Sequence, residues 1–370
     1  MVFKCDKDDI YRSVSSVLRA VPTRAAAATL EGVLLEANKD FVSSTGYNLR
    51  IGIRSDFDAE VFETGAVVVD RNIFSQILSK LPNGDVSIKC DAENKICITS
   101  GKTTFNIAGM SAEDFPELPS IDVLDSVEFD ADTLTNIVNG VAFAASDNES
   151  KPLYTGVLFE IAGKTITAVA LDGYRMAVRH EPIFDEAPQE MKFVLPADSL
   201  REAARFAKGS GKVTLRLGKL HAAISANNTT LITRRLEGEF MDWKNAIASQ
   251  GDICVPVDRD ELATRLDRVS VVLSDHYKAP VVCEFADHAL KLSAETPLGR
   301  ADERCSVGSN DELKIGFNYR YLLDALKAAD GNTVRLIMKN SVTGCFILPQ
   351  DESDDSFAYL VLPVRIKDGK

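Results

Sequence analysis

The sequence lacks the usual marks of a membrane, secreted or metal-binding protein. No apolar run approaches the roughly 18 residues that a membrane helix needs. The first residues, MVFKCD, lack the basic and then apolar pattern of a signal peptide, so a cytoplasmic protein is expected. The seven cysteines contain no C-x-x-C pair, and the four histidines have no metal-ligand spacing. Reduced thiols are therefore expected, with no disulfide, metal or cofactor.

Motifs for common catalytic chemistry are also missing. There is no G-x-S-x-G elbow, no G-x-x-x-x-G-K-[ST] loop and no H-E-x-x-H helix. Asp172, His180 and one of the serines could be imagined as a triad, but nothing in the sequence positions them. Asp172 is instead expected to bond to backbone in its Asp-Gly turn. A non-catalytic protein is predicted, with an enzyme as the alternative of a different class.

An excess of positive charge is absent as well. The 55 acidic residues outnumber the 42 Lys and Arg, which gives a net charge of −13 at pH 7. A conventional nucleic-acid binder carries a basic excess, so any such function depends on where the cations lie. With 370 residues, of which 45% are hydrophobic, the chain suits two or three globular domains.

What the sequence does contain is an internal repeat of about 125 residues. Three short apolar strand patterns end in Glu36, Glu160 and Glu284, which are 124 residues apart. Acidic residues typical of helix starts precede each strand, because carboxylates satisfy free backbone N–H groups there. These starts lie at 6–10, 130–134 and 258–262; second helices are predicted at 72–81, 199–208 and 321–329, and strands after glycine-containing turns at 83–88, 211–215 and 331–336.

The repeat predicts an α+β fold of three tandem similar domains, at 1–120, 121–250 and 251–370. Alternating apolar residues at 94–99 and 164–169 predict two-faced sheets. The repeat is too long for a solenoid unit, so it indicates a duplicated domain. Similar domains joined by short linkers can curve into an arc or ring, and separate beads are the alternative.

Arginine and lysine recur on the predicted helices at spacings that place them on one face. If these helices line one surface, that surface is basic and touches phosphates without reading bases. For any single helix, a solvated face is the simpler interpretation. The residues are Arg12, Arg19, Arg201, Arg205, Lys208, Arg265 and Arg268, with Arg320 and Lys327 spaced in the same way.

Four motifs together resemble the bacterial sliding clamps, the beta subunit of DNA polymerase III. ALDGYRMA at 170–177 resembles the A-T-D-G-H-R-L-A of that family, and VLPVR at 361–365 its terminal M-P-M-R. FPEL at 115–118 resembles F-P-x-L, and GEFMDW at 238–243 resembles G-x-F-P-D-Y. The matches run from the first helix to the last strand, and the combination is more specific than any one motif.

The resemblance implies a sliding clamp that encircles duplex DNA and tethers the replicative polymerase for processive synthesis. Two chains would form a head-to-tail homodimeric ring, with helices inside and sheets outside, that holds DNA topologically. The implied partners are double-stranded DNA of any sequence, the DNA polymerase III alpha-type subunit, the clamp loader, and other DNA polymerases, ligase and mismatch-repair proteins with clamp-binding peptides. The implied location is the cytoplasm, at the nucleoid or replisome. A scaffold that binds peptides without encircling DNA remains the second alternative.

The resemblance also implies a hydrophobic peptide pocket between the second and third domains. Leu, Met and Val around a glycine-bearing loop suit apolar peptide anchors, although the C-terminal strand alone would be interpreted as core. Leu171 replaces the usual Thr, Met241 the usual Pro, and Asn245 stands where some members have Arg, which puts the peptide preference in doubt. The implied pocket residues are Tyr154, Leu171, Gly173, Tyr174, Arg175, Met176, Met241, Asn245, Ala246, Val342, Gly344, Leu360, Val361, Leu362, Pro363, Val364 and Arg365.

By position, the resemblance further implies DNA contacts by Arg24, Lys151 and Arg71. For the dimer interface it implies one apolar edge with Phe105 and Ile107 and another with Val272 and Leu273. Unlike edges of this kind can close a ring. Lys102 could face Asp302 or Glu303, but Leu298 and Arg300 replace acids often seen there, so fewer ion pairs are expected.

Overall fold

The computed structural model describes residues 1–187, 189–248, 251–273 and 279–366. Its contacts divide the chain into two compact units, each described here by itself. The first unit comprises Met1–Leu134 and Asp198–Arg235, and the second comprises Thr135–Ala197 and Leu236–Lys370. The middle repeat contributes to both units, so the boundaries near 120 and 250 remain predictions.

The helices begin where the acidic patterns predict. Asp6 accepts a hydrogen bond from the Asp8 N–H, and Asp258 accepts one from the Glu261 N–H, so both cap the helix that follows. The helices are α1 (Lys7–Val17), α2 (Arg71–Lys80), α3 (Ala131–Val141), α4 (Ala197–Ala207), α5 (Trp243–Ala248), α6 (Arg259–Val269) and α7 (Tyr319–Ala328). Short 3-10 turns are η1 (Leu18–Ala20), η2 (Ala28–Glu31), η3 (Ala112–Asp114), η4 (Ala142–Ala144), η5 (Pro152–Thr155) and η6 (Ser270–Val272).

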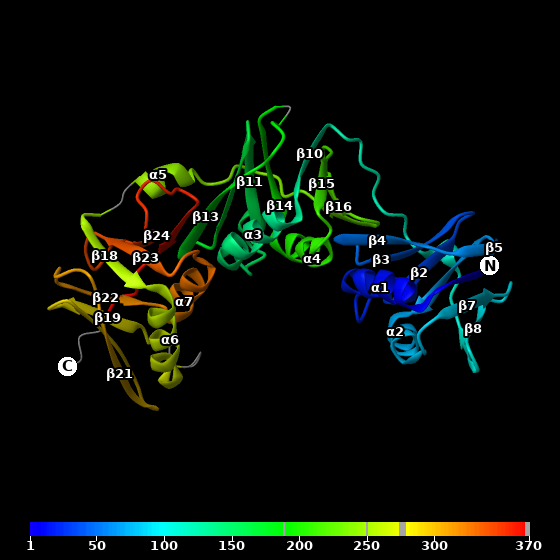
Figure 1. The fold of residues 1–370 in the computed structure, drawn as a ribbon, viewed down its shortest axis with the longest axis horizontal. Helices are drawn as coiled ribbons and strands as arrows, with labels where there is room; N and C mark the ends of the chain where they lie inside the picture. Colours follow the sequence, from blue (N-terminus) through cyan, green and yellow to red (C-terminus); the bar gives the residue numbers. More distant parts are fainter. Residues whose placement is uncertain (188, 249–250, 274–278, 367–370) are drawn as a thin grey trace. The chain divides into compact units, whose positions relative to one another are not determined.

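The first unit holds two antiparallel sheets (Figure 1). The five-stranded sheet runs in the order β5 (Glu60–Glu63), β1 (Val2–Asp6), β7 (Asp85–Cys90), β8 (Lys95–Ser100) and β9 (Thr103–Ala108). The eight-stranded sheet runs β10 (Asp125–Asp130), β15 (Lys212–Leu217), β16 (His221–Ala226), β17 (Thr229–Arg234), β4 (Ile51–Asp58), β3 (Phe41–Tyr47), β2 (Gly32–Ala37) and β6 (Gly65–Asp70).

The second unit repeats this plan with another pair of antiparallel sheets. Its eight-stranded sheet runs β14 (Met191–Pro196), β11 (Gly156–Ala162), β12 (Thr165–Leu171), β13 (Arg175–Pro182), β25 (Phe357–Val361), β24 (Cys345–Pro349), β23 (Thr333–Met338) and β18 (Ile253–Asp258). Its four-stranded sheet runs β21 (Gly299–Ser306), β20 (Ala289–Thr296), β19 (Val281–Ala286) and β22 (Leu313–Phe317).

The predicted order of helix, strands, helix and strands is present in all three repeats, but each repeat begins with one strand that the sequence did not predict: β1, β10 or β18. The glutamate-ending patterns become β2, β11 and β19, and the strands after the second helices become β7, β15 and β23. Helix α1 packs against β3 and β4 through Ile10, Val14 and Val17, all almost fully buried, as the helical spacing predicts. All seven cysteines are free thiols, five of them buried.

Each eight-stranded sheet joins strands of two different repeats along one seam. In the first unit, β4 of the first repeat pairs with β17 of the second, from Thr229 opposite Ser55 to Thr233 opposite Ile51. In the second unit, β13 of the second repeat pairs with β25 of the third, from Arg175 opposite Val361 to Arg179 opposite Phe357. Neighbouring repeats therefore share backbone hydrogen bonds as well as side-chain contacts.

Candidate functional site

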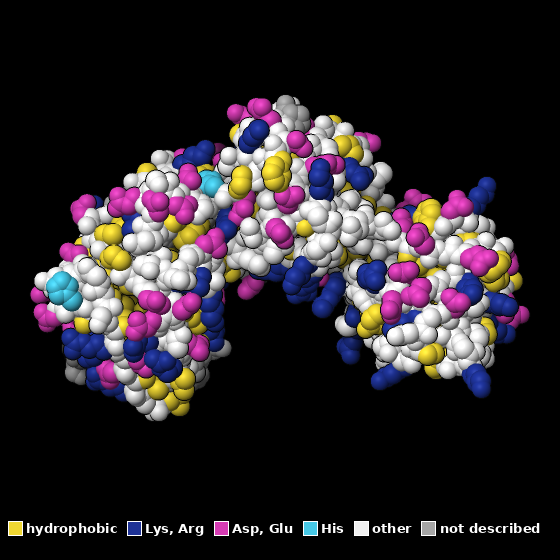
Figure 2. All heavy atoms as spheres, in the orientation of Figure 1, with side chains coloured by type: hydrophobic (Ala, Val, Ile, Leu, Met, Phe, Trp, Pro, Cys, Tyr) yellow, Lys and Arg dark blue, Asp and Glu magenta, His cyan; other side chains and the backbone are white. Residues whose placement is uncertain are grey.

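Three of the arginines predicted to contact DNA share one hollow in the first unit. The hollow has a volume of about 500 Å³ and lies between α1 and α4, where three arginines (Arg12, Arg19 and Arg205) and two acids (Asp8 and Glu202) line it. Arg205 pairs with Glu202 at 2.8 Å. Tyr11 and Phe206 provide apolar walls, and Tyr11 is 38% exposed. Guanidinium groups beside aromatic rings at an open surface suit a phosphate backbone. Figure 2 shows dark blue cationic side chains below α4, while acidic side chains are scattered over the visible surface.

The other predicted cations of the first unit have mixed surroundings. Arg24 and Lys208 are exposed and therefore accessible to a ligand. Arg71 is half-buried and donates to the backbone carbonyl of Val21, so it holds the chain near η1. Arg201 forms an ion pair with Asp198 at 2.7 Å on the surface of α4.

Cations predicted in the second unit are engaged by neighbouring side chains. Lys151 lies 5.7 Å from the centre of the Tyr154 ring, beside a predicted pocket residue. Arg265 and Arg268 of α6 both hydrogen bond to the carboxylate of Glu303 on β21, at 2.8 and 2.7 Å. The hydrogen bonds from Arg268 and Arg265 lower the pKa of Glu303 to about 2. The sequence spacing of Arg265 and Arg268 gave no sign of this partner.

The predicted peptide pocket has a buried apolar floor. Leu171 and Met176 are 2% and 3% exposed and belong to one core cluster with Trp243. Tyr154, Ala246 and Leu360 pack against the same cluster. Val361 is also buried, opposite Arg175 in the β13–β25 pairing. The buried residues of the C-terminal strand therefore belong to the core, as the strand alone suggested, whereas the exposed residues remain available for a peptide.

Apolar side chains that remain in solvent surround this floor. They are Tyr174, Met241, Val342, Leu362 and Val364, with exposures from 36% to 76%. Leu362 donates its N–H to the Tyr174 carbonyl at 2.8 Å, which joins the C-terminal segment to the loop after β12. A side chain at Gly344 would collide with Leu360, so this glycine lets the chain before β24 lie close to Leu360 of β25. We call these five exposed residues, together with the floor, the apolar patch.

The remaining predicted pocket residues lie beside the apolar patch. Gly173 has a φ of +93°, a conformation that favours glycine and that turns the chain between Asp172 and Tyr174. Asn245 donates to the carboxylate of Asp242, the residue before α5, at 2.6 Å. Pro363 and Arg365 alternate along the chain with the exposed Leu362 and Val364.

Arg175 is the best anchored of the predicted pocket residues. Its guanidinium pairs with Asp172 at 3.0 Å and with Asp324 of α7 at 2.6 Å. It also lies 4.4 Å from the centre of the Tyr321 ring, on which Tyr174 stacks. The sequence did not identify Asp324 or Tyr321 as part of this site, because their distance along the chain hides the contact.

The imagined catalytic triad is not assembled. Asp172 accepts hydrogen bonds from the N–H groups of Tyr174 and Arg175 at 2.8 and 3.0 Å, as predicted for an Asp-Gly turn. His180 instead bonds to Thr167, and its ring lies 6.3 Å from that of Trp243. Among the described residues, no three His, Cys, Asp or Glu side chains gather in a way that could hold a metal ion.

The predicted interface residues lie on or beside two edge strands, β9 and β21, and at the end of η6. Phe105 and Ile107 are half-buried on β9, and Lys102 is exposed in the turn before it. Asp302 and Glu303 lie on β21, where both already have ion-pair partners within the chain. Leu273 is 8% exposed, whereas its unpredicted neighbour Val271 is 80% exposed.

The whole chain matches models of one protein family. Residues 1–119, 128–242 and 244–365 match the N-terminal, central and C-terminal domains of the DNA polymerase III beta subunit. A beta sliding clamp of Bacillus subtilis is 28% identical over 99% of this chain and 100% of its own length. One of Synechocystis is 30% identical over 98% of both chains.

Solved structures give the same result. A structure from Eubacterium rectale, described as a putative DNA polymerase III beta subunit, has a TM-score of 0.92 and 31% identity, over 98% of this chain and 99% of that one. The DNA polymerase sliding clamp of Bacillus subtilis has a TM-score of 0.92 and 27% identity, over 99% and 100%. The fold is thus the clamp fold, present as three tandem domains.

The chain belongs to the DNA polymerase III beta-subunit family, the DNA sliding clamps that give polymerases their processivity. This family acts as a non-catalytic processivity factor. Among the helices of the described residues, none has both the length and the apolar character that crossing a membrane requires.

Proposed function

We propose that two copies of this chain close head to tail into a ring around duplex DNA, and that peptides of replication and repair proteins dock on the apolar patch. The single observation that carries the DNA half of this proposal is the hollow between α1 and α4. It collects Arg12, Arg19 and Arg205 from two different repeats of a chain whose net charge is −13. Cations gathered locally on an acidic protein suit loose phosphate contacts inside a ring.

A closed ring accounts for DNA association without a basic excess. Retention is then topological, because the duplex can leave only at a DNA end or through an opened ring. Contacts need only be weak and independent of sequence, which lets the protein slide. Arg24, Lys151 and Lys208 add to these contacts in the proposal, whereas Arg71 holds its own backbone. The location that fits work on replicating DNA is the cytoplasm.

The peptide half of the proposal is carried by the exposure of the apolar patch. Five apolar side chains stay in solvent around a buried floor, a pattern typical of a site for apolar peptide anchors. The proposed partners are the polymerase III alpha-type subunit, the clamp loader, and other polymerases, ligase and mismatch-repair proteins. Leu171 and Met241 make the site more apolar than the family motif does, so we expect larger apolar anchors to be favoured.

Ring formation and DNA retention are tested together. Class averages from negative-stain electron microscopy are expected to show closed rings with a hole wider than a duplex. Protein loaded by a clamp loader onto nicked circular DNA is expected to stay bound in gel filtration and to leave when the DNA is linearised. Retention that does not depend on DNA ends would favour the non-encircling scaffold instead.

The interface residues are tested by Phe105→Asp. A carboxylate on the half-buried face of the β9 edge is expected to split the dimer, because closing the ring would bury an unpaired charge. The solution mass by sedimentation equilibrium reports the outcome. A dimer of unchanged mass would remove Phe105 from the interface.

Peptide docking is tested with a fluorescein-labelled clamp-binding peptide from a polymerase III alpha subunit. Leu362→Asp places a charge on the apolar patch and is expected to weaken binding by about tenfold or more. Leu220→Asp is the matched control, because Leu220 is 41% exposed against 39% for Leu362 and lies outside the apolar patch. Equal affinities of the two variants would contradict the assignment.

A further inference from the structure

Each of the four sheets in the described residues ends in two edge strands, and two of these edge strands are β9 and β21. β9 is the last strand of the five-stranded sheet and pairs with β8, and β21 is the first strand of the four-stranded sheet and pairs with β20. The free edge of each strand carries backbone N–H and C=O groups that can pair with another chain. The proposed head-to-tail ring brings β9 of one copy to β21 of the next.

The β9 edge carries no charge. Its sequence, TTFNIA, is neutral at every position. Phe105 lies opposite Ile98 and Ile107 opposite Ile96, and both isoleucines are fully buried. Phe105 and Ile107 therefore continue the core face of the sheet to its edge, where they remain half-buried.

The β21 edge carries a carboxylate on the corresponding face. Glu303 lies opposite Leu292, which is fully buried, so Glu303 also stands on the core side of its sheet. If Glu303 had no cation beside it, contact with Phe105 and Ile107 of a second copy would remove water from its carboxylate and provide no ion pair in return. The neutral β9 strand provides no cation for it.

The cations that pair with Glu303 come from its own chain. Arg265 donates to one oxygen of Glu303 at 2.8 Å and Arg268 to the other at 2.7 Å. Arg265 is held in turn by Glu261 at 2.6 Å. Both carboxylate oxygens are thus occupied before any partner arrives. Figure 2 shows the dark blue side chains that gather near β21.

Two of the three charges on the outer face of β21, Arg300 and Asp302, follow the same rule, and the third is the exposed Arg304. Arg300 pairs with Asp302 at 2.8 Å and approaches Glu295 at 3.8 Å. Asp302 also approaches Lys291 at 3.7 Å. Beside the strand, Leu298 and Val271 are 64% and 80% exposed, an apolar surface next to a self-neutralised edge.

We infer that the Arg265–Glu303–Arg268 cluster positions and neutralises the β21 edge from within one chain, so that a second copy docks on it through backbone pairing and apolar contact without intersubunit ion pairs. This inference rests on the proposed ring. It assigns Arg265 and Arg268 to the subunit interface as positioning residues, in place of the DNA contact that their spacing predicted. It also leaves Lys102 with no required partner across the interface.

The ionic strength dependence of dimerisation follows directly. Screening weakens ion pairs between subunits, whereas backbone pairing and apolar contact are little affected. Between about 50 mM and about 1 M NaCl, the dimer dissociation constant of the unmodified protein is expected to change by less than about threefold. Sedimentation velocity over a dilution series measures it. A larger weakening with salt would show intersubunit ion pairs and overturn the inference.

A variant tests the cluster itself. Glu303→Gln leaves Arg268 without its carboxylate and Arg265 with Glu261 alone, and it is expected to weaken the dimer about tenfold at low salt. Because screening then relieves the uncompensated arginines, the affinity of this variant is expected to recover as salt rises. Glu295→Gln on the neighbouring β20 is the matched control and is expected to leave the dimer unchanged. Equal dissociation constants for the two variants would remove the positioning role.

The two proposals fail in different ways. If Phe105→Asp remains dimeric, the β9 edge is not the interface and the proposed ring geometry is wrong. If Phe105→Asp is monomeric but the unmodified dimer weakens steeply with salt, the ring stands and only the self-neutralised edge is wrong. The salt titration needs no variant, so it decides the inference even if Glu303→Gln folds poorly.

Discussion

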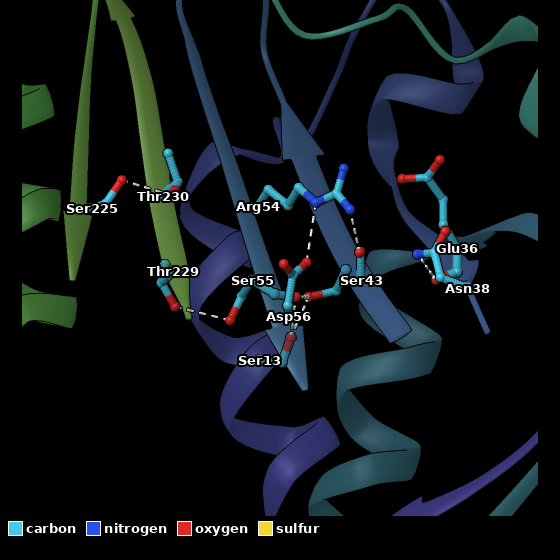
Figure 3. Close-up of polar contacts among 11 residues, drawn as sticks. Ser13, Glu36, Asn38, Ser43, Arg54, Ser55, Asp56, Ser225, Thr229 and Thr230 are labelled. Atoms are coloured by element: carbon cyan, nitrogen blue, oxygen red, sulfur yellow. Dashed lines mark hydrogen bonds and ion pairs between the residues drawn. The ribbon is translucent and has the colours of Figure 1, made fainter. Parts of the chain in front are cut away.

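The two seams that join neighbouring repeats have the same length but different chemistry. Both β4–β17 and β13–β25 pair over five residues of each strand. Hydroxyl groups dominate the first seam: Ser55 and Thr229 bond across it at 2.9 Å, and Ser13 of α1 donates to the Ser55 carbonyl at 2.9 Å. Figure 3 shows these side chains meeting between β17, β4 and α1.

The second seam is mainly apolar, but its paired residues include the buried Arg179 of β13. Phe357 and Tyr359 stack on one face, and Met176 and Leu360 join the Trp243 cluster on the other. Arg179, 8% exposed, pairs with Glu181 and with Asp330, each at 2.7 Å. Because both seams pair over the same number of residues, we expect their side chains to set any difference in stability.

A glycine in α3 leaves room for the Arg179 side chain. A Cβ atom at Gly140 of α3 would lie 2.6 Å from Cδ of Arg179, so any other residue there would force the arginine side chain to move. Glycine inside a helix costs roughly 1 kcal/mol relative to alanine. That cost is offset where Arg179 reaches Asp330 and where the Tyr359 hydroxyl donates to the Ala328 carbonyl at 3.0 Å. The second seam is thus tied to the end of α7.

The largest expected effect comes from breaking the second seam. Arg179→Ala leaves Glu181 half-paired in a buried position and is expected to lower the free energy of unfolding by about 2 kcal/mol. Trp243, the only tryptophan, lies in the cluster on this seam, so its fluorescence reports unfolding there. Arg300→Ala, on the exposed strand β21, is the control. A urea midpoint unchanged from the parent would show that the ion pairs do not stabilise the seam.

A smaller loss is expected from the first seam. Ser13→Ala removes a buried hydroxyl that bonds to Ser44 at 2.6 Å and to the Ser55 carbonyl, and about 1 kcal/mol of stability is expected to be lost. Circular dichroism during urea unfolding should shift while the Trp243 fluorescence transition stays in place. Equal shifts of both signals would mean that the two units unfold together. The stabilities of the two seams could then not be told apart.

The second seam should also respond to pH through His180. Burial lowers the pKa of His180, against a smaller raising effect of Asp355. Because the unfolded chain takes up a proton near pH 6.5 and the folded imidazole resists it, stability is expected to fall as pH drops below about 6.5. The loss should disappear in His180→Gln. Trp243 fluorescence during urea unfolding between pH 5 and 8 measures it.

The smallest effect is expected from a paired substitution in the first seam. Ser55→Ala with Thr229→Val removes both partners of one hydrogen bond and replaces them with apolar groups, so a change within about 0.5 kcal/mol is expected. Either single variant should cost more than the pair. A double-mutant cycle on the urea midpoints gives the coupling between the two hydroxyls. Additive losses would show that the hydroxyls do not stabilise each other.

Local chain features allowed much of the fold to be predicted. Asp6 and Asp258 cap helices because a carboxylate next to an apolar periodic segment acts within a few residues. The Asp172 turn followed for the same reason, and the equal spacing of Glu36, Glu160 and Glu284 exposed the repeat. Edge pairing between repeats was not predictable, since any two strands with free edges satisfy the same local pattern.

The site divides in the same way. The sequence located the exposed Tyr174, Met241 and Leu362 through family motifs, and it placed Arg12 and Arg19 on one helix face. It could not find Asp324 under Arg175, or Glu303 between Arg265 and Arg268, because these partners come from distant strands and helices.

By itself, the sequence determined the composition of each repeat, the order of its elements, its helix starts and its family. Those properties depend on residue periodicity and on contacts within a few positions. Only the tertiary structure decided which charged side chains form ion pairs within the chain and which remain exposed to solvent. Arg268 and Arg19 are both exposed arginines near the ends of the first helices of their repeats. Of these two, only Arg268 pairs with Glu303, because the β21 edge runs beside α6.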